Sequence, residues 1–247
     1  MEDKFEPLAY RQSVEDRRDQ IRDKITTALV KAKRDDTVTL IAVTKYIDPL
    51  RARVIAEAGI RDFGENRWQV AKPKIEEALP VTWHFLGPIQ RNKVKPIAQH
   101  FDSIHSVDRV EIIDLLDRYA GEYAKKLDLF LQVNISQEEQ KSGVDPDQVE
   151  ALAKAILMKE HVKFKGLMLI GTQHADDLQK RHEFNSLYAI SKALKQSLSL
   201  EHLDLSMGMS DDFPIAIEEG ATMVRIGRYL VVEENTSTFK RNGVSLD

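Results

Sequence analysis

Short apolar runs alternate with longer segments of helical periodicity along most of the chain. The run 40–43 (Leu-Ile-Ala-Val) has no polar alternation, which is typical of a parallel strand buried on both faces. Eight such runs, each followed by a helical pattern until the C-terminus, predict a parallel sheet. The expected strands are 39–44, 60–64, 82–86, 103–107, 128–133, 165–170, 202–205 and 222–226.

An additional helix is expected before the first strand. Ser13 and Asp16 resemble a capping box, and a stripe of apolar residues at helical spacing runs from Val14 to Leu29. The other helix starts with capping signals are Asp48-Pro49, Asp108 with Glu111, Asp145-Pro146, and Ser210 or Asp211.

The length of the chain fits one domain. It has 247 residues, and a single (β/α)₈ barrel usually has about 250. We therefore predict an α/β fold, a (β/α)₈ TIM barrel with an additional N-terminal helix, over residues 1–232. An open doubly wound sheet is the alternative. Residues 233–247 are polar without periodicity, and we expect a loosely docked tail there.

Composition excludes several function classes. A net charge of −4 argues against a general nucleic-acid or membrane binder. The chain has no cysteine, so disulfides, thiolate zinc sites and thiol catalysis are excluded. The histidines show no metal-ligand spacing. With no signal-peptide pattern and no apolar run of transmembrane length, we expect a cytoplasmic protein, and a monomer.

Lys45 stands at the end of the first expected strand. Active-site groups of barrels lie at the C-terminal ends of strands. Desolvation at a buried strand end lowers the pKa of an amine from about 10.4, so a neutral fraction can attack a carbonyl. The competing interpretation is a lysine that reaches from the strand end to water.

The loops after the seventh and eighth strands favour an anion site. They read Ser206-Met-Gly-Met-Ser210 and Arg225-Ile-Gly-Arg228, and phosphate commonly binds at these two loops in barrels. Asp211 and Asp212 would repel a phosphate, so an anion must lie on the other side of that turn. A reactive lysine opposite a phosphate pocket suits pyridoxal phosphate or a phosphorylated sugar or aldehyde, and both remain open at this point.

Longer motifs carry a family resemblance. They are Ala42-Val-Thr-Lys45, Phe63-Gly-Glu-Asn66, Trp83-His-Phe-Leu-Gly-Pro-Ile-Gln-Arg-Asn-Lys93, His105-Ser-Val-Asp108, Gln132-Val-Asn-Ile-Ser136, Lys141-Ser-Gly143, Gly166-Leu-Met168, Leu205-Ser-Met-Gly-Met-Ser-Asp-Asp212 and Val224-Arg-Ile-Gly227. In this order, over roughly residues 13 to 228, they resemble the pyridoxal-phosphate homeostasis protein family.

This resemblance implies a barrel similar to the N-terminal domain of alanine racemase, with pyridoxal 5′-phosphate (PLP) held as an internal aldimine on Lys45. It also implies that an arginine facing the pyridine nitrogen keeps that nitrogen unprotonated, which makes the cofactor a weak electron sink. The roles carried over are Asn66 and His84 on the ring side, Ser206, Gly208 and Gly227 at the phosphate, and Arg225 at the pyridine nitrogen.

The sequence departs from the family pattern in two places. Gly166-Leu-Met168 is followed by Leu-Ile-Gly-Thr172, where a Thr-Ile-Pro type of segment is more usual. The Arg-Ile-Gly motif is followed by Arg228 instead of a threonine or serine that would bind phosphate. We hypothesise that Arg228 replaces this hydroxyl with a charged phosphate contact.

Three functions follow from these observations. The first is a binding protein that holds PLP, contributes to vitamin B6 and amino-acid homeostasis without strong catalysis, and passes the cofactor to apoenzymes. The second is a PLP-dependent amino-acid racemase, which needs acid/base groups on both faces of the substrate. The third is a phosphosugar aldolase or isomerase acting through Lys45.

Overall fold

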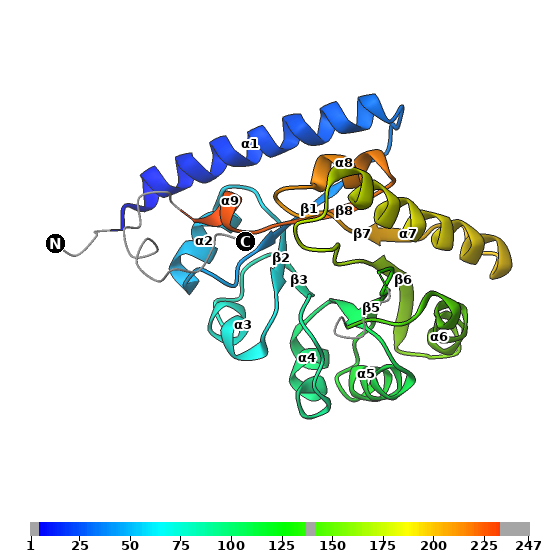
Figure 1. Ribbon diagram of the computed structural model, residues 1–247. Coiled ribbons are helices and arrows are strands. Elements are labelled where there is room, and N and C mark those ends of the chain that lie inside the picture. Colours follow the sequence, from blue (N-terminus) through cyan, green and yellow to red (C-terminus); the bar gives the residue numbers. More distant parts are fainter. Residues whose placement is uncertain (1–4, 137–141, 233–247) are drawn as a thin grey trace.

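The computed structural model describes residues 5–136 and 142–232, and its strands close into one parallel barrel in the order β1 to β8 (Figure 1). Ile41 on β1 pairs with Asp62 on β2 and with Arg225 on β8, which closes the ring. The predicted (β/α)₈ barrel is confirmed. The strands are β1 (Thr39–Val43), β2 (Asp62–Glu65), β3 (Thr82–Phe85), β4 (Ser103–Val107), β5 (Leu127–Gln132), β6 (Val162–Met168), β7 (Asp204–Ser206) and β8 (Met223–Ile226).

The helices surround this barrel. They are α1 (Pro7–Lys31), α2 (Pro49–Glu57), α3 (Trp68–Ile75), α4 (Val94–His100), α5 (Val110–Glu122), α6 (Val149–Leu157), α7 (Asp177–Ser197), α8 (Phe213–Glu218) and α9 (Arg228–Val231), with 3₁₀ turns at Arg91–Lys93 and Pro146–Gln148. The tail 233–247 and Lys141 of the Lys-Ser-Gly motif lie outside the described residues.

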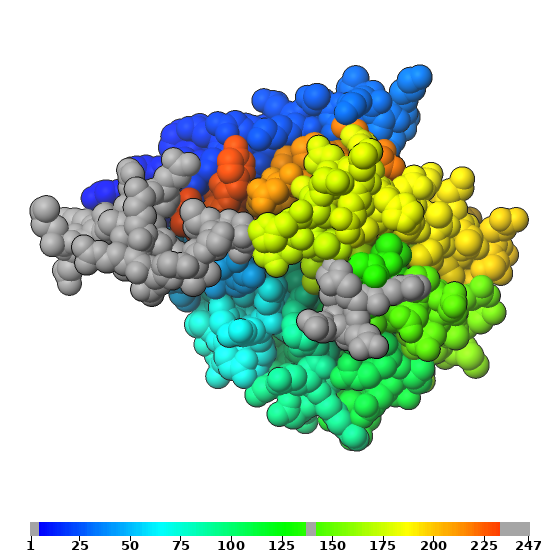
Figure 2. Space-filling view, in the orientation of Figure 1, coloured from blue at the N-terminus to red at the C-terminus, as the bar shows by residue number. Residues whose placement is uncertain are grey.

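The predicted additional helix is α1, but its predicted start was wrong. The helix begins at Pro7, because proline at the first helical position needs no N–H partner, and Ser13 lies inside the helix. Tyr10 is fully buried, and its hydroxyl donates to the Val231 carbonyl at 2.6 Å. Helix α1 thus lies across α8 and α9. Figure 2 shows α1 with α7, α8 and α9 as one continuous surface.

Two other predicted caps were also wrong. Helix α5 is preceded by Arg109 instead of Asp108, whose carboxylate pairs with Arg109. Helix α8 is preceded by Asp212 instead of Ser210 or Asp211. By contrast, Asp48 caps α2 as expected and accepts a hydrogen bond from the Arg51 N–H at 2.9 Å. Local capping signals therefore placed some helix starts to within a few residues only.

Successive residues of a strand face opposite sides of the barrel wall. On β2 and β3, Phe63 and Trp83 pack edge to face, with ring centroids 5.5 Å apart, and belong to the apolar layer between barrel and helices. Their neighbours Asp62 and His84 consequently face the barrel interior, where they form a hydrogen bond. No helix of the described residues is long and apolar enough to cross a membrane.

Candidate functional site

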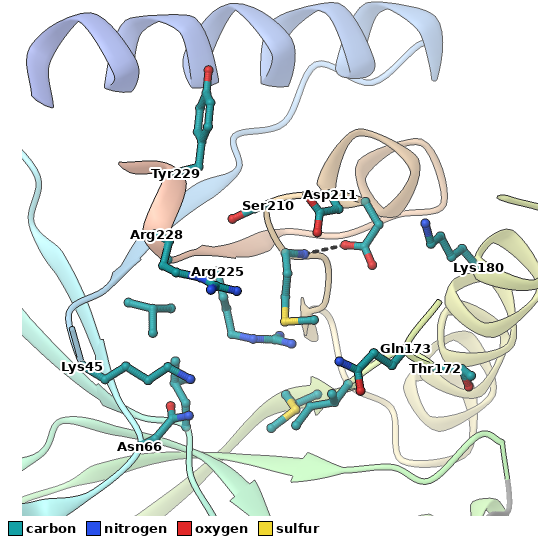
Figure 3. A pocket seen from close by; sticks show the side chains of 18 of the residues that line it. Lys45, Asn66, Thr172, Gln173, Lys180, Ser210, Asp211, Arg225, Arg228 and Tyr229 are labelled. Atoms are coloured by element: carbon teal, nitrogen blue, oxygen red, sulfur yellow. Dashed lines mark hydrogen bonds between the residues drawn. The ribbon is translucent and has the colours of Figure 1, made fainter. Parts of the chain in front are cut away.

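A cavity of about 810 Å³ opens at the C-terminal end of the barrel. Its walls come from the ends of β1, β2, β6 and β8 and from the loops after β6 and β7. Five of the eight residues expected to bind a cofactor line it, namely Lys45, Asn66, Arg225, Gly227 and Arg228. Figure 3 shows Lys45 and Asn66 close together on one side, with Arg225 and Arg228 nearby.

Lys45 follows the end of β1 and extends into this cavity. The sequence predicts a buried environment at this strand end, but Lys45 is only partly buried. The amine lies 4.9 Å from the centroid of the Tyr46 ring, which favours a cation over the ring face. Lys45 and Tyr46 therefore lie together on one wall of the cavity.

Arg225 lies at the base of the cavity and is 5% exposed. Its Nη1 donates to the Ser206 carbonyl at 2.7 Å and to Ser206 Oγ at 2.9 Å, and its Nη2 donates to the Leu169 carbonyl at 2.9 Å. Burial lowers the pKa of Arg225 to about 10, so the group stays positively charged at neutral pH. A guanidinium has five N–H groups, and the remaining ones have no acceptor among the described residues.

The turn after β7 lies on another wall. Gly208 adopts a φ of +92°, and Met209 N–H donates to Asp212 Oδ1 at 2.6 Å (Figure 3). Burial raises the pKa of the Asp212 carboxyl. Ser210 and the exposed Asp211 also line the cavity. An anion near this turn would approach Ser210 instead of the carboxylates.

Arg228 is the first residue of α9, directly after Gly227. Its guanidinium carbon lies 5.8 Å from the centroid of the Tyr46 ring, so Tyr46 contacts both cations, Lys45 and Arg228. The segment after β6 that departs from the family pattern also lies at the cavity, because Ile170, Gly171 and Thr172 line it. Both sequence positions that differ from the family pattern are therefore in the site itself.

Three expected site residues lie elsewhere. His84, Ser206 and Gly208 do not line the cavity. His84 is 2% exposed and lies in the barrel interior, where it contacts Asp62 and His105. Ser206 is fully buried beneath Arg225. Their contacts with a ligand stay predictions. Tyr46 and Lys180 are among the lining residues for which the sequence predicted no cofactor role.

The cavity suits a small anionic aldehyde. Among the described residues, the cavity is lined by the four cationic side chains of Lys45, Lys180, Arg225 and Arg228 and by the two carboxylates of Asp211 and Asp212. An amine, a guanidinium with N–H groups that have no acceptor among the described residues, and a backbone near Gly227 are groups that fit the aldehyde, ring nitrogen and phosphate of PLP. The described residues contain no cluster that could hold a metal ion.

Known proteins resemble this chain in sequence and in fold. The sequence profile of the family described as alanine racemase, N-terminal domain, matches residues 17–234. A pyridoxal phosphate homeostasis protein from Pseudomonas aeruginosa is 43% identical over 210 residues, which cover 84% of this chain and 90% of the relative. That from Pasteurella multocida is 39% identical over 214 residues, covering 84% and 92%.

The chain belongs to the pyridoxal phosphate homeostasis protein family. PipY of Synechococcus elongatus, solved with PLP bound, is structurally similar with a TM-score of 0.78 and 35% identity, covering 88% of this chain and 99% of PipY. An alanine racemase from Clostridium difficile shares the fold, with a TM-score of 0.68 at 12% identity. The relatives carry the name of homeostasis proteins and not of enzymes.

Proposed function

We propose that this protein binds PLP in the barrel cavity through a Schiff base on Lys45. The observation that carries the proposal is that the Lys45 amine and the buried Arg225 guanidinium line the same cavity. Lys45 would hold the cofactor covalently, because a primary amine condenses with an aldehyde to a C=N bond and the aldehyde oxygen leaves as water. In this proposal Arg225 would donate one of its remaining N–H groups to the ring nitrogen, and Gly227 and Arg228 would hold the phosphate.

The proposed role is to hold and buffer a reactive aldehyde. An arginine at the ring nitrogen supplies a hydrogen-bond donor but no transferable proton at neutral pH, because its pKa is about 10. A ring nitrogen without a proton withdraws fewer electrons, so the site favours binding over carbanion chemistry. Transfer to apoenzymes is part of the proposal, and the exposed Ile170 and Met209 beside the cavity support access from outside.

The decisive experiment is the absorption spectrum of the purified protein with PLP, before and after borohydride reduction, followed by mass mapping of the modified peptide. We expect a Schiff-base band and a reduced adduct on Lys45. Lys45→Ala should remove the adduct, whereas Lys180→Ala, which changes the other cavity lysine, should keep it. Protein that stays colourless and unmodified, or an adduct that maps to Lys180, would contradict the proposal.

The alternative functions receive no specific support. A racemase needs a second acid/base group facing the substrate. One candidate, the Tyr229 hydroxyl, donates to Gln20 on α1 at 2.8 Å and points away from the cavity. A phosphosugar aldolase would be colourless and stabilised by sugar phosphates. Assays of amino-acid racemisation and of thermal shifts with sugar phosphates separate these cases.

A monomeric state and a cytoplasmic location complete the proposal. The chain contains no cysteine, a composition compatible with a reducing compartment. Sedimentation of the full chain with and without PLP tests the monomeric state. A sedimentation coefficient typical of a dimer in both conditions would overturn it. Cell fractionation tests the cytoplasmic location.

A further inference from the structure

A line of polar side chains, all buried except the partly exposed Asp62, crosses the interior of the barrel. Asp62 Oδ1 lies 2.9 Å from His84 Nε2, and His84 Nδ1 lies 3.0 Å from His105 Nε2. His105 Nδ1 lies 2.9 Å from Ser206 Oγ, which accepts from Arg225 Nη1 at 2.9 Å. These contacts connect β2 to Arg225 at the base of the proposed PLP site.

This arrangement is unusual for the fold. Barrel interiors are filled mainly by branched apolar side chains, yet His105 and Ser206 are fully buried here. Strands β4 and β7 are not neighbours in the sheet, so the bond between His105 and Ser206 spans the interior. Phe130 stacks on His105, with ring centroids 4.2 Å apart. Burying a polar group is costly unless it is hydrogen-bonded. Each side chain in the line therefore depends on its neighbours for a hydrogen-bond partner.

When His84 carries a single ring hydrogen, the chemistry of the two ends gives the line one direction. Arg225 only donates, so Ser206 Oγ must accept at that end. The Asp62 carboxylate only accepts, so His84 must donate from Nε2. Burial, with His84 and Arg225 nearby, holds the pKa of His105 well below its usual range, and His105 therefore carries a single ring hydrogen. When His84 also carries one, His105 donates from Nε2 and accepts at Nδ1 from the Ser206 hydroxyl.

We propose that Asp62, His84 and His105 are positioning residues that commit the Ser206 hydroxyl hydrogen to His105. Ser206 then serves Arg225 as an acceptor and has no hydrogen to offer the phosphate of a bound cofactor. The direction of the hydrogen bonds does not depend on the proposed PLP site, but their effect on phosphate binding does. This direction agrees with the position of Ser206, which does not line the cavity, and it leaves Ser210, which does, as the serine available to an anion.

The direction of the line can be measured without any cofactor. In the full chain labelled with ¹⁵N-histidine, two-bond proton–nitrogen spectra identify the tautomer of each ring, and His105→Gln assigns the resonances of His105. We expect the hydrogen of His105 on Nε2. A wild-type protein with that hydrogen on Nδ1 at neutral pH would overturn the proposal.

A variant that reverses the line makes the test sharper. The Asp62 side chain is 28% exposed, so Asp62→Lys can place a donor where an acceptor was. His84 must then accept at Nε2 and donate from Nδ1, and the His105 hydrogen should move to Nδ1. Ser103→Ala is the matched control, because it removes a buried hydroxyl of β4 that has no partner among the described residues. An unchanged His105 tautomer in folded Asp62→Lys would contradict the proposal.

Should Asp62→Lys fail to fold, Ser206→Ala keeps the proposal testable. It should change the Nδ1 resonance of His105 while the hydrogen stays on Nε2. An unchanged Nδ1 resonance would contradict a hydrogen bond donated by Ser206.

Ligand binding tests the consequence for Ser206. Ser206→Ala should weaken PLP and pyridoxal by the same factor, because pyridoxal lacks only the phosphate. Ser210→Ala should weaken PLP and leave pyridoxal unchanged. A loss of about tenfold or more for PLP alone in Ser206→Ala would show a phosphate donor and overturn the proposal. If the wild type binds neither ligand, the proposed function fails, while the histidine tautomers still decide the direction of the line.

Discussion

Lys74 and Glu65 form a fully enclosed ion pair directly behind the strand end that bears Lys45. The Lys74 amine also donates to the Thr44 carbonyl at 2.6 Å, and Thr44 Oγ1 donates to Glu65 Oε1 at 2.7 Å. The pair therefore fastens α3 to the ends of β1 and β2, next to Lys45 and Asn66. It also separates the two lysines by role, since Lys74 is committed to structure and Lys45 faces the cavity.

Removing one partner of this pair should be costly. Lys74→Met leaves the Glu65 carboxylate buried without its cation, and the free energy of unfolding should fall by about 3–5 kcal/mol. The double variant Lys74→Met with Glu65→Gln removes the uncompensated charge and should recover part of this loss. Urea unfolding measures the free energy of unfolding of the single and the double variant. A double variant no more stable than Lys74→Met would show that charge burial is not the cause.

The pH dependence of stability should report His105. Its pKa is depressed by burial and by the nearby His84 and Arg225, whereas in the unfolded chain it is about 6.5. Below that value the unfolded state binds a proton that the native state does not, so stability is lost as the pH falls. The slope contributed is up to about 1.4 kcal/mol per pH unit. Urea unfolding of the wild type and of His105→Gln between pH 7 and pH 5 measures this contribution. The prediction is contradicted if the free energy of unfolding changes with pH in the same way in both proteins.

Arg228 should contribute to PLP binding through its charge. Arg228→Thr restores the hydroxyl that is usual at this position in the family and removes a cation from the cavity wall. We expect PLP affinity to fall roughly five- to tenfold, because charge-assisted hydrogen bonds are stronger than neutral ones. Pyridoxal, which lacks the phosphate, is the control ligand and should bind the two proteins alike. If the threonine variant binds PLP as tightly as the wild type, the hypothesis for Arg228 is wrong.

The two glycines expected at the phosphate should behave differently. A Cβ at Gly208 would lie 2.6 Å from Ala216 Cβ, and its φ of +92° disfavours other residues. Gly208→Ala should therefore cost about 1–3 kcal/mol of stability, which thermal unfolding measures.

At Gly227 a Cβ would meet Tyr46 Cε2 at an ordinary 3.5 Å. Gly227→Ala should keep most of the stability and lose PLP affinity in a binding titration, because the methyl group narrows the cavity beside the backbone. The reverse pattern, with stability lost at Gly227 and affinity alone lost at Gly208, would refute this division.

Sequence reasoning succeeded where the signal is local. The apolar run before Lys45 and the Asp48-Pro49 helix start depend on neighbouring residues only, and both elements form as expected. It failed at Ser13, where Pro7 starts the helix earlier, and at Asp108, whose carboxylate contacts Arg109. Several residues near a helix start have capping chemistry, and packing selects among them.

The number and order of the strand-forming runs and the chain length thus favoured the barrel over an open sheet, and the position of Lys45 after the first run made it the candidate reactive group. Tertiary structure alone decided the roles of Glu65, His84 and Ser206. Glu65 turns outward to Lys74 on α3, and His84 and Ser206 meet His105 and Arg225 inside the barrel. The partners of these residues come from distant strands and helices that become neighbours only when the barrel closes, so no local pattern in the sequence specifies them.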